Sequence, residues 1–296
     1  MRFFAPAKLN LSLDLGPTRG DGYHEIRSVM QAVSLGDRLL VVPAKSFRLH
    51  NPAVEGPDLV VRAAEVFRRA TGVEPALAIS VGKRIPIGAG LGGGSSDAAS
   101  ALRAMRGMLL PSLPVSELAA MAREIGSDVP FFLGPAPRAL AVGRGETLSP
   151  LPAAAPRYVL IAWPGVPLST AAVYRESAAG KGDGTDRVLS GAELAPNDLE
   201  PAALRLCPEL QALLREAAGA GISLRVTGSG SAAFALHGNG EDAMRGLSAL
   251  RRLAPRAILC QTLERWPWQG LPAAGQPTAG KAPPPFRGGG RDDGAA

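Results

Sequence analysis

Cysteine and histidine are both scarce in this chain of 296 residues, which contains two cysteines and three histidines. Cys207 and Cys260 form neither a disulfide pattern nor the spacing of a metal site. Their number excludes a small secreted scaffold held together by disulfide bonds. The same usage is typical of a reducing compartment, so we expect a cytoplasmic protein.

Long apolar runs are also missing. The longest uncharged stretch, residues 158–174, is broken by Pro164 and Pro167, which argues against a membrane span. Near the N-terminus, Lys8 and Asn10 stand where a signal peptide would be apolar. We therefore expect neither a membrane span nor a leader.

Aromatic residues make up only 5% of the chain, and its formal net charge is +6. The charge is scattered, and no basic stripe with interleaved aromatics is present, so we do not expect nucleic acid as a partner. A positive net charge is consistent with a small anionic substrate. Hydrophobic residues reach 46%, which is enough for a sizeable core in one large or two medium domains.

Glycine is concentrated in residues 86–100, which read PIGAGLGGGSSDAAS. Glycine accepts positive φ angles and lets a ligand approach the main chain, so a run of glycines can turn successive N–H groups toward one anion. Residues 77–81 predict a strand before the run, and apolar spacing from Ala98 onward predicts a helix whose N-terminus adds positive charge. We expect Ser95 or Ser96 to cap that helix. The stretch therefore predicts a phosphate-binding loop.

Three interpretations of this glycine loop are open on the residues alone. A flexible linker is the first, although linkers rarely separate a clear strand from an amphipathic helix. A dinucleotide-binding fold is the second, because Gly88, Gly90 and Gly93 match G-x-G-x-x-G, but no acidic residue follows about 20 residues later to bind a ribose. The third is a nucleoside triphosphate site that is not a Walker A loop, since no Gly-Lys-Ser/Thr occurs here.

Alternation and helical spacing predict two α/β halves. A half-buried strand is expected over residues 4–15, where leucines alternate with polar residues. Further strands are predicted at residues 37–42, 139–142, 146–148, 158–162, 224–227, 232–237 and 257–263, and helices at residues 59–70, 118–125, 200–204, 208–217 and 242–253. The order in the second half is similar to a split βαβ, ferredoxin-like layer. We expect an N-terminal domain in residues 1–155, a C-terminal domain in residues 156–268 and a disordered tail in residues 269–296.

Three polar residues have ordinary structural explanations before any family is considered. Lys8 shares the polar face of the strand at residues 4–15 with Asn10, and the strand alone favours a solvated edge lysine. Asp128 stands just before a Val-Pro pair, which favours a helix N-cap. His24 follows a turn and by itself indicates a surface histidine.

The glycine loop closely resembles the phosphate-binding loop of the GHMP kinases, the superfamily of galactose, homoserine, mevalonate and phosphomevalonate kinases. Their pattern is P-x-x-x-G-L-G-S/G-S-S/A-A, and residues 86–98 follow it with glycine at the variable position. Seven segments occur in the order PAKLNLSLDL, GYHEIRSVMQAVSLGD, PIGAGLGGGSSDAA, GSDVPFF, PGVPLST, NDLEP and VTGSGSAAF. Together they are similar to one branch of the superfamily, the 4-diphosphocytidyl-2-C-methyl-D-erythritol kinases, over residues 5–263.

The resemblance implies a two-domain α/β (α+β) GHMP kinase fold with a ferredoxin-like C-terminal domain. It implies ATP-dependent phosphorylation of the 2-hydroxyl of a cytidine diphosphate-linked methylerythritol, a step toward isoprenoid precursors by the non-mevalonate route. ATP would be the phosphoryl donor, with Mg²⁺ bridging its phosphates. The alternatives are another GHMP kinase, of the homoserine or mevalonate type, and a non-catalytic nucleotide-binding module. We expect a monomer or a homodimer.

The same resemblance implies roles for particular residues. Lys8 and Asp128 would be catalytic, because they fall on the family's Pro-Ala-Lys and Asp-Val-Pro motifs. The residues implied in ATP binding are Lys83, Pro86, Ile87, Gly88, Ala89, Gly90, Leu91, Gly92, Gly93, Gly94, Ser95 and Ser96. Those implied in acceptor binding are Asn10, Tyr23, His24 and Tyr174, with the aromatic residues recognising cytosine.

Two further details complete the expected site. Gly228-Ser229-Gly230 resembles the family's C-terminal glycine motif, which lines the same site, although the segment alone also fits a hairpin turn. Asp58 departs from the asparagine that the family often has near the adenine, so Lys83 is expected to serve there instead. Ser96 is the candidate for contact with Mg²⁺.

Overall fold

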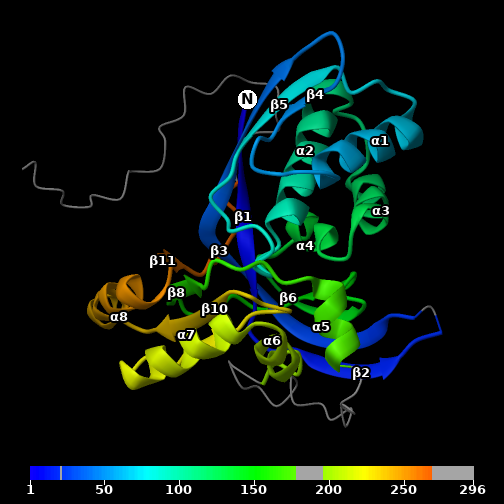
Figure 1. Ribbon diagram of the computed structural model, residues 1–296. Helices are drawn as coiled ribbons and strands as arrows, with labels where there is room; N and C mark the ends of the chain where they lie inside the picture. The colour runs from blue at the N-terminus through cyan, green and yellow to red at the C-terminus, as the bar shows by residue number, and fades with distance from the viewer. Residues whose placement is uncertain (21, 178–195, 269–296) are drawn as a thin grey trace, which may run out of the picture.

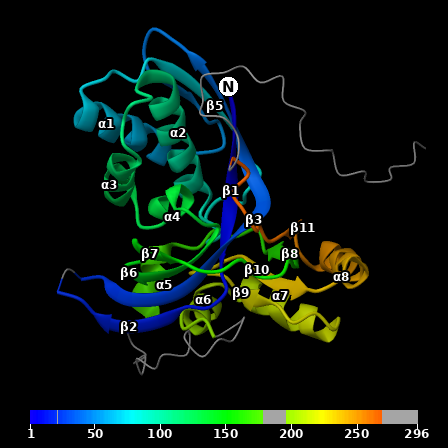
Figure 2. The ribbon, with the colours of Figure 1, turned by 180° about the vertical axis from the view of Figure 1, so that it is seen from behind.

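The computed structural model describes residues 1–20, 22–177 and 196–268 (Figures 1 and 2). The tail predicted at residues 269–296 lies outside the described residues. Within them, one sheet is built from the N-terminal half of the chain and a second, smaller sheet from the C-terminal half. The expected mixed α/β architecture is confirmed.

The first sheet has seven strands among the described residues and is organised around one long strand, β3. The strands are β1 (Arg2–Asn10), β2 (Asp14–Thr18), β3 (His24–Pro43), β4 (Arg48–His50), β5 (Leu77–Gly82), β6 (Arg138–Gly143) and β7 (Thr147–Pro150). The strand order is β4-β5-β3-β6-β7, and β1 and β2 also pair with β3. Because β3 is 20 residues long, its first half pairs with β2 and β6 while its second half pairs with β5.

Four helices cover one side of this sheet, as Figures 1 and 2 show from opposite directions. They are α1 (Leu59–Thr71), α2 (Gly93–Leu109), α3 (Val115–Ile125) and α4 (Val129–Leu133). Asp58 caps α1 by accepting a hydrogen bond from the Val60 N–H, and Gly72 ends the helix in the left-handed conformation. The apolar faces of these helices and of the sheet form the first core, in which Phe67 and Leu102 are fully buried.

The second sheet confirms the predicted ferredoxin-like layer. Its strands are β8 (Tyr158–Trp163), β9 (Arg225–Val226), β10 (Ala233–His237) and β11 (Arg256–Gln261), in the antiparallel order β11-β8-β10-β9. Helices α5 (Thr170–Ser177), α6 (Glu200–Leu206) and α7 (Pro208–Gly219) lie between β8 and β9 in the chain, and α8 (Gly240–Leu253) lies between β10 and β11. The first strand is therefore central, as a split βαβ arrangement requires.

A third apolar cluster, which we call the seam, joins the two sheets. Its buried members from the N-terminal half are Ala7, Leu9, Leu11, Val29, Val33, Leu35, Ile85, Ala89 and Leu91, and those from the C-terminal half are Val159, Ile161, Ala232, Phe234 and Cys260. Strand β11 also contacts β3 through the bridge between Val33 and Thr262. Because both halves contribute fully buried side chains to the seam, they pack as one body.

Two expectations about the strands are wrong. The strand expected over residues 4–15 is two strands, because β1 ends at Asn10 and β2 begins at Asp14. Its polar face is also not solvated, since β1 is covered on both faces and its residues from Ala5 onward are buried. The strand expected at residues 37–42 is present but belongs to the longer β3, which begins at His24; polar and apolar residues do not alternate strictly in its first half.

No helix among the described residues has both the length and the apolar character needed to cross a bilayer. Cys207 and Cys260 are both buried free thiols, as the absence of a disulfide pattern predicts.

Candidate active site

The glycine loop connects β5 to α2 and has the backbone geometry of an anion-binding turn. Gly88, Gly90 and Gly92 all have positive φ angles, between 67° and 77°. Side chains are rarely tolerated at such angles, which explains why glycine occupies every second position. Helix α2 begins at Gly93, so the loop leads straight into the positive end of a helix.

The expectation that a serine caps this helix is wrong. Gly92 is the N-cap, and Ser95 and Ser96 lie inside the first turn of α2. The helix is capped three or four residues earlier than predicted, at Gly92, which takes the left-handed conformation. The hydroxyls of both serines are therefore not used for the cap.

A second glycine turn, between β9 and β10, packs against the first. A Cβ atom built on Gly90 would lie 2.8 Å from the carbonyl oxygens of Thr227 and Gly230. The Ala232 N–H donates to the carbonyl oxygen of Ala89 at 3.0 Å. The two turns, far apart in sequence, therefore meet back to back, and the expectation that Gly228-Ser229-Gly230 lies beside the loop is confirmed.

Lys8 lies in β1 directly under the glycine loop and is only 5% exposed. Its backbone N–H donates to the carbonyl oxygen of Leu91 at 3.0 Å. Its ammonium group donates to Asn10 Oδ1 at 2.6 Å and lies 3.4 Å from Asp128 Oδ2. The solvated edge lysine that the strand alone favours is therefore excluded, since the C-terminal half and the loop cover this part of β1.

Asp128 occupies the N-cap position just before α4, but its side chain does not cap the helix. No backbone N–H of α4 donates to its side chain, and its carboxylate reaches Lys8 instead. About a third of the Asp128 side chain is exposed, so the carboxylate is both paired and accessible. Asp128 is thus the N-cap residue by position, as the residues alone indicate, but its carboxylate pairs with Lys8 instead of the helix, which brings together the two residues predicted to be catalytic.

Asn10 connects this pair to the second glycine turn. Its backbone N–H donates to Thr227 Oγ1 at 2.8 Å, and its Nδ2 donates to Ser28 Oγ at 2.7 Å. A Cβ atom on Gly228 would lie 2.8 Å from Asn10 Oδ1. The amide is thus fixed on both sides, with its oxygen turned toward Lys8.

His24 and Tyr174 lie together beside this centre. Their rings stack at an interplanar angle of 27°, with centroids 6.1 Å apart. Burial, and then the negative charge of Asp128, raise the pKa of Tyr174 above its ordinary value, so this aromatic pair lies near the carboxylate. Tyr23 is placed differently: it is 54% exposed, and the Arg144 guanidinium lies 4.9 Å from its ring centroid.

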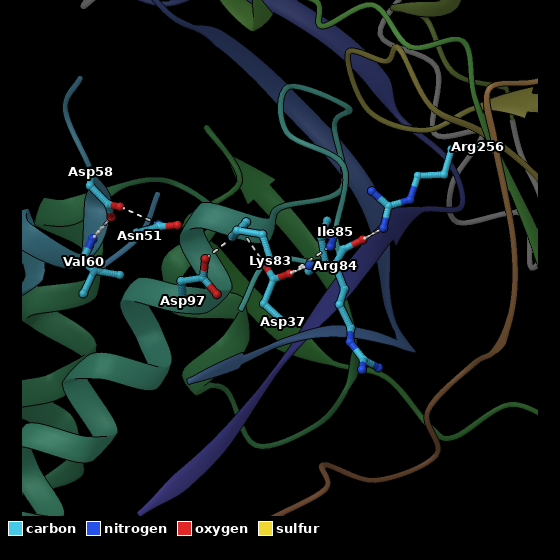
Figure 3. Close-up of polar contacts among 9 residues, drawn as sticks. All are labelled: Asp37, Asn51, Asp58, Val60, Lys83, Arg84, Ile85, Asp97 and Arg256. Atoms are coloured by element: carbon cyan, nitrogen blue, oxygen red, sulfur yellow. Dashed lines mark hydrogen bonds and ion pairs between the residues drawn. The ribbon is translucent and has the colours of Figure 1, made fainter. Parts of the chain in front are cut away.

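Lys83 forms a buried ion triad at the root of the glycine loop (Figure 3). Its ammonium group lies 2.5 Å from Asp37 Oδ2 and 2.8 Å from Asp97 Oδ2. Asp37 also accepts hydrogen bonds from the backbone N–H groups of Arg84 and Ile85. The triad therefore ties β3, the entry to the loop and helix α2 into one polar unit.

The triad places two buried carboxylates against a single ammonium group. Burial raises the pKa of Asp97 from its ordinary value to about 7, although Lys83 opposes that rise. Burial alone would lower the pKa of Lys83, but Asp97 and Asp37 together raise it. One oxygen of Asp97 also lacks a hydrogen-bond partner within the described residues, which adds to the cost of its charge.

The free energy of unfolding should therefore fall as the pH rises from about 4 to about 7, because folded Asp97 holds a proton that the unfolded chain has released. Asp97→Asn removes the titrating group and keeps an oxygen for Lys83. Denaturant titrations of both apo proteins at about pH 5 and about pH 8 should show the parent losing stability relative to the variant. Equal losses in the two proteins would mean that Asp97 is ionised throughout.

A nucleoside triphosphate brings an Mg²⁺ ion, and few side chains near the loop could bind it. No group of three or more His, Cys, Asp or Glu side chains in the described part of the chain could hold a metal ion by itself. The Ser96 hydroxyl is buried and has no hydrogen-bond partner among the same residues. One spare hydroxyl fits an ion held mainly by phosphate oxygens, the arrangement that Mg²⁺ prefers.

Sequence reasoning missed two residues of this region, Asp37 and Thr227. Asp37 is fully buried, yet its partner Lys83 lies 46 residues away and no local pattern connects them. Thr227 Oγ1 accepts from the Asn10 backbone across 217 residues. A signal did exist for Asp37, because it lies just before an apolar run in residues 39–42, and a carboxylate that is buried in a strand needs a partner.

Comparison with known proteins agrees with this geometry. The family described as the GHMP kinases N terminal domain matches residues 58–134, and the GHMP kinases C terminal family matches residues 186–256. A 4-diphosphocytidyl-2-C-methyl-D-erythritol kinase from Anaeromyxobacter dehalogenans (strain 2CP-C) is 39% identical, covering 95% of this chain and 98% of that protein. One of the same name from Caulobacter vibrioides (strain NA1000 / CB15N) is 40% identical, covering 79% of this chain and 88% of the relative.

Solved structures give the same result. A crystal structure of a 4-(cytidine 5'-diphospho)-2C-methyl-D-erythritol kinase superposes with a TM-score of 0.75 at 37% identity, covering 88% of this chain and 99% of that one. A homoserine kinase from Cytophaga hutchinsonii, at 20% identity and a TM-score of 0.63, covers 89% of this chain and 94% of its own, and shares the fold alone. The chain belongs to the 4-diphosphocytidyl-2-C-methyl-D-erythritol kinase family of the GHMP kinases.

Proposed function

We propose that this protein transfers the γ-phosphoryl group of ATP to the 2-hydroxyl of 4-diphosphocytidyl-2-C-methyl-D-erythritol, in the non-mevalonate synthesis of isoprenoid precursors. One observation carries the proposal: Lys8 and Asp128 meet at 3.4 Å beside the glycine loop, and Tyr174, which stacks on His24, lies close enough to Asp128 for its charge to raise the pKa of the tyrosine. A phosphate cradle on one side and an aromatic pair on the other are what a kinase for a nucleotide-linked acceptor needs.

The donor would bind along the glycine loop. Residues 86–94 would surround its phosphates with backbone N–H groups, and the start of α2 would add positive charge. Mg²⁺ bound with ATP supplies neutralisation of the phosphate charge, and Ser96 is the hydroxyl on this chain that would face it. Lys83 would contribute to the donor site through the triad that holds the root of the loop.

Asp128 and Lys8 would act on the acceptor hydroxyl. Phosphoryl transfer depends mainly on positioning and on stabilisation of charge, so a carboxylate that orients the alcohol and accepts its proton is sufficient as a base. Lys8 would orient Asp128 through their 3.4 Å contact and would neutralise charge that builds between donor and acceptor. Asn10, fixed by Ser28 and Thr227, would hold the acceptor and Lys8 in place.

Cytosine recognition is proposed for His24 and Tyr174, with Tyr23 at the rim. Stacking on an aromatic ring is worth about 1–3 kcal/mol and tolerates any base, so discrimination must come from hydrogen bonds to the base edge. A neutral imidazole offers one donor and one acceptor for that edge. A site built to pair a polar group rejects the analogue that lacks it, because its own buried groups go unpaired.

The cytidine-linked acceptor should accordingly be phosphorylated much faster than its uridine counterpart. His24→Ala should narrow this difference, because it removes the polar ring at the base. Tyr174→Ala should raise KM for the acceptor and leave KM for ATP unchanged, whereas Tyr174→Phe should be nearly silent. The measurement is kcat/KM for both nucleotides on all four proteins, and equal values in the parent would return the chain to the wider GHMP superfamily.

A coupled assay of ADP release tests the reaction itself. The parent enzyme is offered the cytidine-linked methylerythritol, homoserine and mevalonate in separate reactions. Release with the first acceptor alone is the expected result. Faster release with homoserine or mevalonate would overturn the assigned substrate, and the absence of ADP release with all three acceptors would indicate a nucleotide-binding protein without kinase activity.

Three wider features belong to the same proposal. The chain has two domains, an N-terminal ATP-binding domain in residues 1–155 and a C-terminal GHMP kinase domain in residues 156–268. The enzyme works in the cytoplasm as a monomer or a homodimer. Its partners are small molecules, with no role for nucleic acid or a membrane.

A further inference from the structure

The residues that follow β11 pack against the N-terminal half of the protein. Residues 262–268, which we call the terminal segment, leave the second sheet and return to the first. Leu263 N–H donates to the carbonyl oxygen of Ala32, and the Gln31 side chain donates to the carbonyl oxygen of Leu263, both at 2.9 Å. These bonds to β3 anchor the terminal segment to the N-terminal half.

The terminal segment places the Trp266 side chain against α4. Trp266 is only 1% exposed, and its ring packs edge-on against Phe131, with centroids 5.6 Å apart, and at a tilt against Phe132, 6.5 Å away. Its Nε1–H donates to the carbonyl oxygen of Gly134 at 2.8 Å. Trp266 therefore holds both the body and the end of α4, the five-residue helix that starts just after Asp128.

The stack continues to a second helix. Trp268 lies almost parallel to Trp266, at 7° and 5.0 Å between centroids, and the Arg103 guanidinium of α2 lies 3.6 Å from the Trp268 ring centroid. Such a cation–π contact is stronger when the cation is partly desolvated. The order Arg103, Trp268, Trp266, Phe131/Phe132 thus connects α2, which begins at the glycine loop, with α4.

Phe132 closes the connection at the site itself. A Cβ atom on Gly92 would lie 3.2 Å from Phe132 Cζ and 3.0 Å from Lys8 Cγ. The ring that Trp266 presses on one side therefore contacts the glycine loop on the other. A five-residue helix has little stability of its own and depends on such tertiary packing.

We propose that Trp266 and Trp268 are positioning residues, which clamp α4 to α2 and so fix Asp128 relative to the glycine loop. The proposal rests on the phosphoryl-transfer function given above. A displacement of about 1 Å in a reacting group can cost 10²-fold in rate, so a loose α4 lowers turnover without removing any group that touches a substrate.

The test compares Trp266→Ala, Trp268→Ala and Trp266→Phe with Phe67→Leu. Phe67 is equally buried in the first core but lies on α1, away from α4, so its variant reports lost packing alone. Folding is checked by circular dichroism and melting temperature, and rates are measured well below each transition with whichever acceptor the parent phosphorylates. If the parent protein shows no kinase activity, that result contradicts the proposed function and says nothing against the positioning role of the two tryptophans.

We expect kcat to fall by about 10- to 100-fold in Trp266→Ala, and by less in Trp268→Ala, with KM for ATP and acceptor nearly unchanged. Trp266→Phe should restore most of kcat, because an aromatic ring still packs against Phe131 and Phe132 although the Nε1–H bond to Gly134 is lost. Phe67→Leu should melt earlier and keep its kcat. If Trp266→Ala does not fold, Trp268→Ala decides, since Trp268 is at the outer end of the stack. Full kcat in the folded alanine variants would overturn the proposal and leave the two tryptophans as stabilising residues.

Discussion

Asp128→Asn is expected to lower kcat by about 10²–10⁴-fold, the range for loss of a general base. Asparagine keeps the shape of the side chain and removes the carboxylate that lies 3.4 Å from Lys8. Binding of ATP should change little, because Lys8 retains its 2.6 Å hydrogen bond to Asn10 and the glycine loop is untouched. The measurements are kcat from ADP release and the Kd for ATP by direct titration.

The matched control for this variant is Glu124→Gln. Glu124 is an exposed carboxylate near the end of α3, four residues before Asp128, and its side chain pairs with Arg69 on α1. Exposed pairs of this kind contribute about 0–1 kcal/mol, so the control should keep both its stability and its turnover. An Asp128→Asn enzyme with more than half the parent kcat would reduce Asp128 to a structural partner of Lys8.

Gly92→Val should abolish productive ATP binding and most of the turnover. Gly92 has a φ of +70°, where a branched side chain is strained by about 1–3 kcal/mol. A Cβ atom there would also lie 3.0 Å from Lys8 Cγ and 3.2 Å from Phe132 Cζ. The valine must therefore displace Lys8 or the Phe132 ring, in addition to crowding the phosphates of a bound nucleotide.

Gly72→Val is the control for Gly92→Val, because it introduces the same backbone strain without displacing a neighbouring side chain. Gly72 has the same φ of +70° at the end of α1, but no atom lies within 4 Å of a Cβ built on it. Both valine variants should lose about 1–3 kcal/mol of stability, whereas only Gly92→Val should lose ATP affinity in a direct titration. ATP binding by Gly92→Val at the parent Kd would show that the loop is not the phosphate site.

Local chemistry made much of this site predictable from sequence. The glycine spacing of residues 86–94 already demands left-handed backbone before a helix, and the structure has that backbone at Gly88, Gly90 and Gly92. The ferredoxin-like order also followed from the periodicity of its strands and helices. Roles for Lys8 and Asp128, in contrast, came from resemblance alone, because a single polar residue on a strand or before a helix has an ordinary explanation.

What could not be predicted depends on contacts between distant segments. The burial of Lys8 requires the glycine loop above it and the turn at Gly228 beside it, which lie about 80 and 220 residues later. The Asp37–Lys83–Asp97 triad and the return of Trp266 to α4 are of the same kind. The contact between Tyr23 and Arg144 could not be predicted either, whereas the role of Tyr23 beside His24 came from the resemblance and stays a prediction.

The seam has a consequence for how this enzyme melts. Ala7, Leu9, Val159 and Phe234 are almost fully removed from water only when both sheets are present. If one half unfolded, the apolar surface that it covers on the other half would be exposed to water, at a free-energy cost of about 25 cal/mol per Å². Two domains in sequence thus behave as a single cooperative unit in heat, and the N-terminal half alone would carry an uncovered apolar surface of the kind that aggregates.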